Sequence, residues 1–177
     1  MKKILTFGGS NSTTSINRTL ATYAGSLLEG CDCTSLDLNE FTMPIYSPEI
    51  ESIHGVPEEA KRFVEYIESA DGIILSLAEH NGSYSAFFKN ILDWCSRHKQ
   101  KLWSDKPMLI MSTSPGARGG STVLDAAKTT FPHLGAKITS TYSLPSFYEN
   151  FTNEEGISDS DLKSRLVSAV DQFSTAL

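Results

Sequence analysis

Hydroxyl side chains crowd the stretch FGGSNSTTSIN, residues 7–17, which follows the first apolar segment of the chain. Five hydroxyls and an amide stand close together there, at Ser10, Ser12, Thr13, Thr14, Ser15 and Asn17. Such small polar residues do not make a core, but they can donate hydrogen bonds to phosphate oxygens. Where a helix begins in such a stretch, its free N–H groups and the positive end of its dipole also favour an anion. The chemistry that these residues favour is the binding of a phosphate group.

The pattern of this first stretch narrows the choice of ligand. It contains no G-x-x-x-x-G-K-[ST] sequence, and therefore no lysine that could reach a nucleoside triphosphate. It contains no G-x-G-x-x-G sequence, which argues against a dinucleotide held at this loop. A hydroxyl-rich loop without its own cation suits a single monophosphate. The alternative is a turn that only caps a helix, and the stretch alone leaves both interpretations open.

Two further polar stretches follow apolar segments, LAEHNGSYSAFFKNILDW at residues 77–94 and STSPGARGGS at residues 112–121. The first contains a flexible link before a helix, Asn81-Gly82-Ser83, and the second contains three glycines, Gly116, Gly119 and Gly120. Glycine lets a backbone lie close to a flat ring and point its amides at it. If the three stretches meet, they predict a site for a flat heterocycle with a phosphate tail.

The elements that must position these stretches alternate along the whole chain. Strands are predicted at residues 4–7, 34–38, 72–77, 108–112 and 136–142. Apolar residues at spacings of three and four predict helices over residues 16–28, 60–67, 88–95 and 162–173, with a less regular one over 122–131. Pro57-Glu58-Glu59 is typical of a helix start, as is Ser158 or Asp159.

Five strands that alternate with five helices predict one α/β domain, residues 1–177, with a doubly wound parallel sheet. The segments GIILSL and MLIM are apolar throughout, as in strands covered on both faces, whereas residues 136–142 alternate as an edge strand does. Ligands of such sheets bind beyond the carboxyl ends of the strands, where the strand order switches. All three polar stretches follow strands at that edge.

Composition bounds the class of protein. A net charge of −6 argues against nucleic acid or an anionic membrane as the main partner. No apolar segment approaches the roughly 18 residues of a membrane span, so we expect no membrane partner and a cytoplasmic protein. The cysteines have no metal-site spacing, and we expect no metal. We expect Cys31 and Cys33 to form a buried, reduced pair on one face of a strand.

Three ordered motifs make the chain resemble the NADPH-dependent FMN reductase family of flavodoxin-like proteins, which includes quinone and chromate reductases. The family motif G-S-x-x-x-x-S-x-N matches Gly9, Ser10, Ser15 and Asn17. The longer motif P-E-Y-N-x-S-x-P-G-x-L-K-N-x-x-D-W matches Glu79, Asn81, Ser83, Lys89, Asn90, Asp93 and Trp94. The motif S-P-G-x-x-G-G matches Ser114, Pro115, Gly116, Gly119 and Gly120. The resemblance spans nearly the whole chain.

The resemblance implies a flavodoxin-like, five-stranded parallel sheet in the order 2-1-3-4-5 and FMN as the cofactor. It implies phosphate binding by Ser10, Ser12, Ser15, Ile16 and Asn17, and flavin-ring contacts from Glu79, His80, Asn81, Gly82, Ser83, Ser114, Gly116, Gly119 and Gly120. The flavin would accept hydride at N5 from NADPH or NADH and pass electrons to a small acceptor such as a quinone or free flavin. No catalytic side chain is required. A homodimer or homotetramer is typical of the family.

The chain departs from the family pattern at several positions. Ser12 stands where many members carry arginine, and Arg18 either replaces that cation or lies in solvent. Ala78 and His80 replace proline and tyrosine of the second motif, and Ser85-Ala86 replaces its later Pro-Gly. Arg118, between the glycines of the third motif, either meets the 2′-phosphate of NADPH or is solvated.

Three other functions share this fold. A flavodoxin-type electron carrier and an FMN-binding interaction module both keep the flavin, and they stay open as alternatives. A phospho-receiver domain requires paired acids after the first strand and an aspartate after the third. Here those strands end in Phe7-Gly8-Gly9 and Ser76-Leu77-Ala78, which excludes it.

Overall fold

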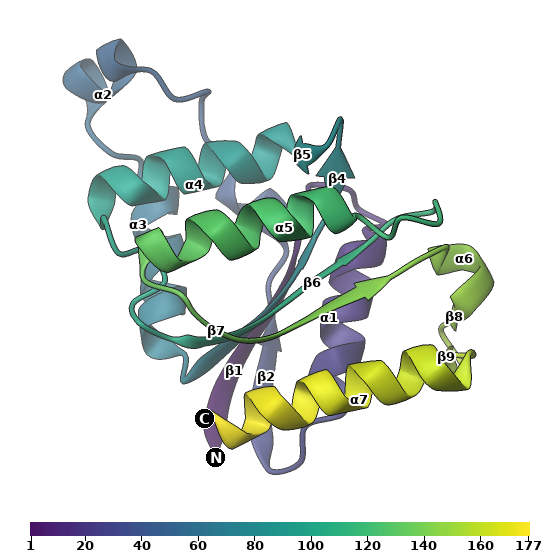
Figure 1. Ribbon diagram of the computed structural model, residues 1–177. Coiled ribbons are helices and arrows are strands. Elements are labelled where there is room, and N and C mark those ends of the chain that lie inside the picture. The colour runs from purple at the N-terminus through teal and green to yellow at the C-terminus, as the bar shows by residue number, and fades with distance from the viewer.

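A five-stranded parallel sheet forms the centre of the computed structural model, which describes all of residues 1–177 (Figure 1). Its order is β2 (Cys31–Ser35), β1 (Lys2–Gly9), β3 (Gly72–Leu77), β6 (Pro107–Thr113) and β7 (Lys137–Leu144). Every neighbouring pair is parallel. Counted within this sheet, the order is 2-1-3-4-5, which confirms the flavodoxin-like topology. β7 is an edge strand, as its alternating pattern predicts.

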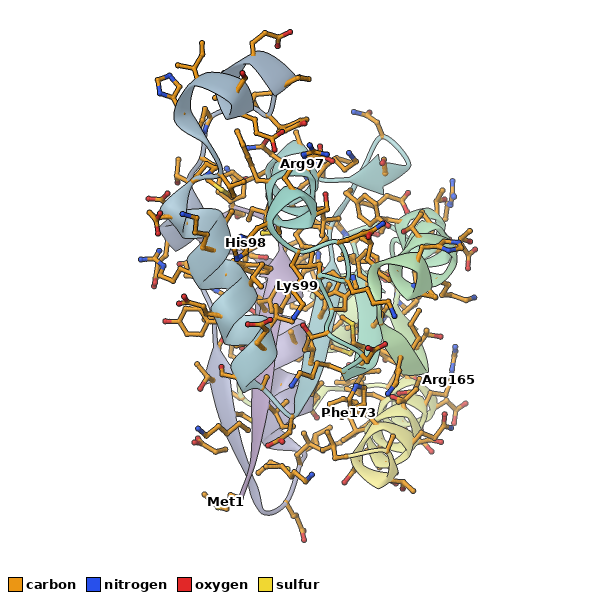
Figure 2. All side chains as sticks on the ribbon, turned by 90° about the vertical axis from the view of Figure 1, so that its left-hand side faces the viewer. Met1, Arg97, His98, Lys99, Arg165 and Phe173 are labelled. Atoms are coloured by element: carbon orange, nitrogen blue, oxygen red, sulfur yellow. The ribbon has the colours of Figure 1, made fainter.

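Helices cover both faces of this sheet. α3 (Glu58–Ser69), α4 (Ala86–His98) and α5 (Ser121–Thr130) pack on one face, and α1 (Ile16–Ser26) and α7 (Ser160–Thr175) pack on the other. Successive residues of β3 point to opposite faces, so Leu75 lies in the first core and Ile74 in the second. Figure 2 shows α7 with the buried Phe173 toward the sheet and the exposed Arg165 on its outer side.

The helix starts follow from capping side chains. Ser15, Ser85 and Asp159 each accept a hydrogen bond from an N–H group in the first turn of the helix that follows. Such a cap typically contributes about 1 kcal/mol. α3 begins immediately after Pro57, as predicted, without a side-chain cap.

Several short elements lie outside the predicted pattern. They are η1 (Leu38–Phe41), α2 (Pro48–His54), the hairpin of β4 (Glu79–His80) and β5 (Ser83–Tyr84), η2 (Phe131–Leu134), α6 (Phe147–Asn150), and the hairpin of β8 (Phe151–Thr152) and β9 (Gly156–Ile157). The first hairpin replaces the flexible link expected at Asn81-Gly82-Ser83. Asn81 and Gly82 have φ values of 53° and 74°, and an Asn-Gly pair with positive φ at both positions is the favoured two-residue hairpin turn.

The second strand differs most from the prediction. It covers Cys31–Ser35 rather than residues 34–38, and it is the other edge of the sheet. Cys33 is therefore exposed and Cys31 is half-buried, so the expected buried pair is wrong, although all three cysteines are free thiols. Only Cys95 is buried, and this burial raises the pKa of its thiol to about 12.

The segment between β2 and α3 carries α2 away from the body of the molecule (Figure 1). None of the residues of α2 is buried. The base of this arm, residues 42–57, is held by Asn90, whose Oδ1 accepts the N–H of Tyr46 at 2.9 Å, and by Trp94, whose Nε1 donates to the carbonyl of Pro44 at 2.8 Å. No helix of the chain combines the length and the apolar character needed to cross a bilayer.

Candidate functional site

The strand order reverses between β1 and β3, and the site lies beyond the carboxyl ends of these strands and of β6. A pocket of about 200 Å³ opens there. The loops after β1, β3 and β6 all contribute to its lining, so the structure brings the three polar stretches together as predicted. A comparable hollow of about 250 Å³ lies between β2 and α3, but it is lined by Lys3, Asp32 and Tyr66 and includes no loop from the carboxyl edge.

The first loop presents hydroxyl groups to the pocket. Ser10, Ser12, Thr14 and Ser15 all line it. The Oγ atoms of Ser10, Ser12 and Ser15 accept the backbone N–H groups of Ser12, Thr14 and Arg18, at 3.1, 3.3 and 3.2 Å. A hydroxyl that accepts in this way can still donate its own proton. The loop therefore fixes these oxygens in place. The hydroxyls of Ser12 and Thr14 share a hydrogen bond at 3.4 Å, whereas the protons of Ser10 and Ser15 are left available for an anion.

The start of α1 supplies further donors to the same pocket. Ile16 and Asn17 line it and occupy the first two positions of the helix. Their N–H groups have no partner within the protein, as expected for the first turn of a helix. These N–H groups and the helix dipole favour an anion at this end of the pocket.

The side chain of Asn17 faces the interior instead of the pocket. It is 3% exposed, its Nδ2 donates to the carbonyl of Thr113, and its Oδ1 accepts from the hydroxyl of Ser76 and the N–H of Thr113 at 2.7 and 3.0 Å. These bonds tie α1 to β3 and β6. The amide of Asn17 is therefore a structural tie between these elements, and the unpaired backbone N–H of Asn17 is a further donor at the start of α1.

The glycines of the first loop also serve packing. A Cβ atom on Gly8 would lie 2.4 Å from the backbone nitrogen of Arg18. On Gly9 it would lie 3.2 Å from the side chain of Leu77 and 3.3 Å from that of Phe88. These glycines let β1 approach α1 and the first core rather than a ligand.

The second loop divides into a lining part and a turn. Glu79 and His80 line the pocket, whereas Asn81, Gly82 and Ser83 form the exposed hairpin turn and do not. The carboxylate of Glu79 accepts the N–H of Val123 at 3.0 Å and so caps α5. Glu79 thus links the second loop to the helix that follows the third.

The third loop combines buried and exposed glycines. Gly119 and Gly120 are buried and have φ values of 58° and 73°. Neither leaves room for a Cβ atom, and a Cβ atom on Gly119 would lie 2.5 Å from the hydroxyl of Ser143. Gly116 is exposed, and its N–H group and those of Ala117 and Arg118 have no partner in the protein. Of the predicted residues in this loop, only Ser114 lines the pocket. Gly116 lies beyond it on the same rim.

Five lining residues are outside the predicted set of cofactor-binding residues, namely Thr14, Ala78, Thr113, Pro115 and Tyr148. Thr113 and Pro115 flank Ser114 within the predicted loop, so their neighbourhood could have indicated them. Tyr148 belongs to α6, which follows the last strand of the sheet. The position of residues 145–150 after the carboxyl end of a fifth parallel strand was an available signal for this segment.

No lysine or arginine lines the pocket. Arg18 forms an ion pair with Asp37 and donates to the carbonyl of Thr13 at 3.2 Å. The backbone N–H of Asn39 and the Arg18 guanidinium both lower the pKa of Asp37 below its ordinary value. Arg118 donates to the hydroxyl of Thr122. Neither arginine therefore supplies a cation to the lining of the pocket.

Comparison with known proteins identifies the family. The sequence pattern of the NADPH-dependent FMN reductases matches residues 2–149. The chain belongs to this family. The match confirms the resemblance carried by the three motifs, and the description of the family names FMN as the flavin and NADPH as the reductant.

Two curated proteins with sequence similarity to the chain are named as reductases. A quinone reductase of Pseudomonas putida is 40% identical over 79 residues, which are 44% of this chain and 42% of the relative. A 2-hydroxy-1,4-benzoquinone reductase of Burkholderia sp is 41% identical over 78 residues, again 44% and 42% of the two chains. The alignment thus spans less than half the length of these curated relatives.

A solved structure matches over the whole fold. FerB, a flavoenzyme NAD(P)H:(acceptor) oxidoreductase from Paracoccus denitrificans, superposes with a TM-score of 0.79 and 26% sequence identity, covering 99% of this chain and 97% of that one.

Proposed function

We propose that the chain is an FMN-dependent NAD(P)H oxidoreductase that passes reducing equivalents to a small acceptor such as a quinone or free flavin. One observation carries the proposal: three loops at the switch point of the sheet share a pocket that presents neutral hydrogen-bond donors at the start of α1. Family membership supports the identity of the flavin and of the reductant.

The donors of this pocket fit a phosphate monoester. The hydroxyls of Ser10 and Ser15 donate to no other group of the protein, that of Ser12 pairs only with the hydroxyl of Thr14, and the N–H groups of Ile16 and Asn17 are unpaired. These groups would hold the phosphate of FMN. The lining from Ala78–His80 and Thr113–Pro115 continues from this end toward the exposed N–H groups of the third loop, and these loops would hold the ring.

FMN supplies the redox chemistry when bound, because its ring accepts hydride and releases electrons to a second substrate. The protein then needs to bind, orient and polarise. The free N–H groups of Gly116 and Ala117 can hydrogen-bond to negative charge that develops on a ring held at this loop. Glu79 is engaged in capping α5 and is not a general base in this account. We therefore assign no side chain to acid or base catalysis.

The class of acceptor is inferred from the names of the curated relatives and from the exposure of the third loop. Both curated relatives described above are quinone reductases by name. Residues 115–118 of the third loop are exposed, so a planar acceptor can approach the ring end of the site from solvent. This supports a small aromatic acceptor.

We also propose a homo-oligomer, either a dimer or a tetramer, in the cytoplasm. The arm supports self-association, because the side chains of Ile45 and Ile53 are each 74% exposed on it and α2 has no buried residue. Three free thiols are typical of a reducing compartment. Sedimentation velocity of the wild type and of an Ile45→Ser, Ile53→Ser double variant would test the interface: the variant should sediment as a smaller species.

An anaerobic titration tests the proposed activity. The protein reconstituted with FMN should be yellow, and NADPH or NADH should bleach its absorption near ~450 nm, as expected when a flavin is reduced. Addition of a benzoquinone should then restore the colour. A protein that takes up no FMN would refute the proposal. A yellow protein that neither nucleotide can bleach would identify an electron carrier or an interaction module instead.

A further inference from the structure

The pocket offers a phosphate dianion no cationic side chain of lysine or arginine, because both nearby arginines are engaged elsewhere. Apart from His80 on the second loop, discrimination between FMN and riboflavin must therefore come from neutral donors. In proteins such donors contribute more when they are fixed in place before the ligand arrives. The lining contains one tyrosine, Tyr148, whose phenolic hydroxyl is a neutral donor.

Tyr148 is held over the pocket by the segment that follows β7, which Figure 1 shows running toward α6. The N–H groups of Ser146 and Phe147 donate to the carbonyls of Gly116 and Ser114, each at 3.0 Å. The side-chain amide of Asn150 donates to the carbonyl of Pro145 at 2.9 Å. The two backbone bonds fasten the segment to the third loop, which itself lines the site, and the Asn150 bond holds the segment together internally.

The backbone of this segment is strained at one residue. Ser146 has φ and ψ of 46° and 59°, a left-handed conformation that costs a non-glycine residue about 1 kcal/mol or more. This conformation starts α6 and sends its first two side chains in different directions. Phe147 is buried and stacks on Phe151 with ring centroids 4.9 Å apart, whereas Tyr148 is 71% exposed.

The ring of Tyr148 is exposed and contacts one other aromatic ring. It meets the ring of Phe147 edge to face, with centroids 5.5 Å apart and an interplanar angle of 87°. Its hydroxyl makes no hydrogen bond within the protein, since none of the side-chain bonds involves it. A large aromatic ring in the lining of a hydroxyl-rich pocket, with its donor unused, is suited to a ligand oxygen.

We propose that Tyr148 is a cofactor-binding residue whose hydroxyl donates to a phosphate oxygen of FMN and so helps the protein to select FMN over riboflavin. The inference rests on the proposed function. It assigns to a neutral phenol on α6 part of the role that a cation at the position of Ser12 would otherwise have.

The test compares two flavins and two tyrosine variants. Tyr148→Phe removes only the hydroxyl. Tyr66→Phe is the matched control because Tyr66 belongs to α3 and lines the hollow near β2, away from the site. Dissociation constants of FMN and of riboflavin are measured by quenching of flavin fluorescence, and the melting temperature of each apoprotein is recorded. Because Tyr148 is exposed, its variant should melt with the wild type.

We expect Tyr148→Phe to raise the dissociation constant of FMN about tenfold, in line with the loss of one hydrogen bond to a charged group. The dissociation constant of riboflavin should stay unchanged, and Tyr66→Phe should bind both flavins as the wild type does. An unchanged FMN constant in Tyr148→Phe overturns the proposal, as does an equal loss for riboflavin, which would place the contact on the ring or ribityl chain. A wild type that binds neither flavin refutes the proposed function itself, and the two failures are thus distinct.

Discussion

The carboxyl edge of the sheet has a buried layer and an exposed layer, and the two differ in what their residues touch. The buried layer consists of Gly8, Asn17, Ser85, Gly119 and Gly120, which contact other parts of the protein. The exposed layer consists of Ser10, Ser12, Thr14, Gly116 and Tyr148, which have donors directed to solvent or the pocket. Asn17, Gly119 and Gly120 of the family motifs lie in the buried layer, whereas Ser10 and Gly116 of the same motifs lie in the exposed layer. A motif can thus mark the scaffold of a site as well as its ligand contacts.

The prediction with the largest expected effect compares a glycine of the buried layer with a glycine of the exposed layer. Gly8→Ala should destabilise the fold by about 3 kcal/mol or more, because its Cβ would lie 2.4 Å from backbone of α1 that cannot move aside. Gly116→Ala should change the free energy of unfolding by less than about 0.5 kcal/mol, because the nearest atom to its Cβ is 3.9 Å away. Urea unfolding of the apoproteins measures both. Equal losses would show that the layers do not differ as described.

A second prediction compares an amide and a hydroxyl of the first loop. Asn17→Ala should cost roughly 2–4 kcal/mol, because it leaves the N–H of Thr113 and the hydroxyl of Ser76 unpaired in the interior. Ser10→Ala should leave stability within about 0.5 kcal/mol of the wild type and should weaken FMN binding. Thermal melts and flavin titrations separate the two outcomes. An Asn17→Ala protein that is as stable as the wild type but binds FMN weakly would show that the Asn17 amide contacts the phosphate.

The prediction with the smallest expected effect concerns FMN binding by one residue of the exposed layer, Ser12. Ser12→Arg adds a cation to a lining that has none, and it should tighten FMN binding about three- to tenfold at low salt. The gain should shrink as ionic strength rises, and riboflavin binding should not change. A gain that salt does not reduce would contradict the assignment of Ser12 to the phosphate end.

The sequence predicted the central sheet well because strands buried on both faces leave a clear apolar signal. The strand at Gly72–Leu77 was predicted with its observed bounds. The edge strand β2 was misplaced because the segment CDCTS has little apolar pattern. Its cysteines were expected to be buried because they share one face of a strand, but the strand lies at the edge of the sheet. The Asn81-Gly82 pair was a hairpin signal that the prediction of a flexible link overlooked.

The site was predicted at the level of loops rather than of atoms. Spacing indicated that the three stretches meet, but it could not show that Asn17 points inward, since this depends on Ser76 and Thr113 from distant strands. Tyr148 gave no sequence signal of its own because its place depends on hydrogen bonds from residues 146 and 147 to the third loop. Long-range contacts of this kind decide which side chain of a polar loop faces the ligand.

The most direct test of the account is a crystal structure of the protein grown with FMN. We expect the phosphate to lie within hydrogen-bond distance of the N–H groups of Ile16 and Asn17 and of the hydroxyls of the first loop, with the ring beside Gly116. A phosphate bound at any other edge of the sheet, or a flavin held only by its ring with its phosphate in solvent, would contradict it.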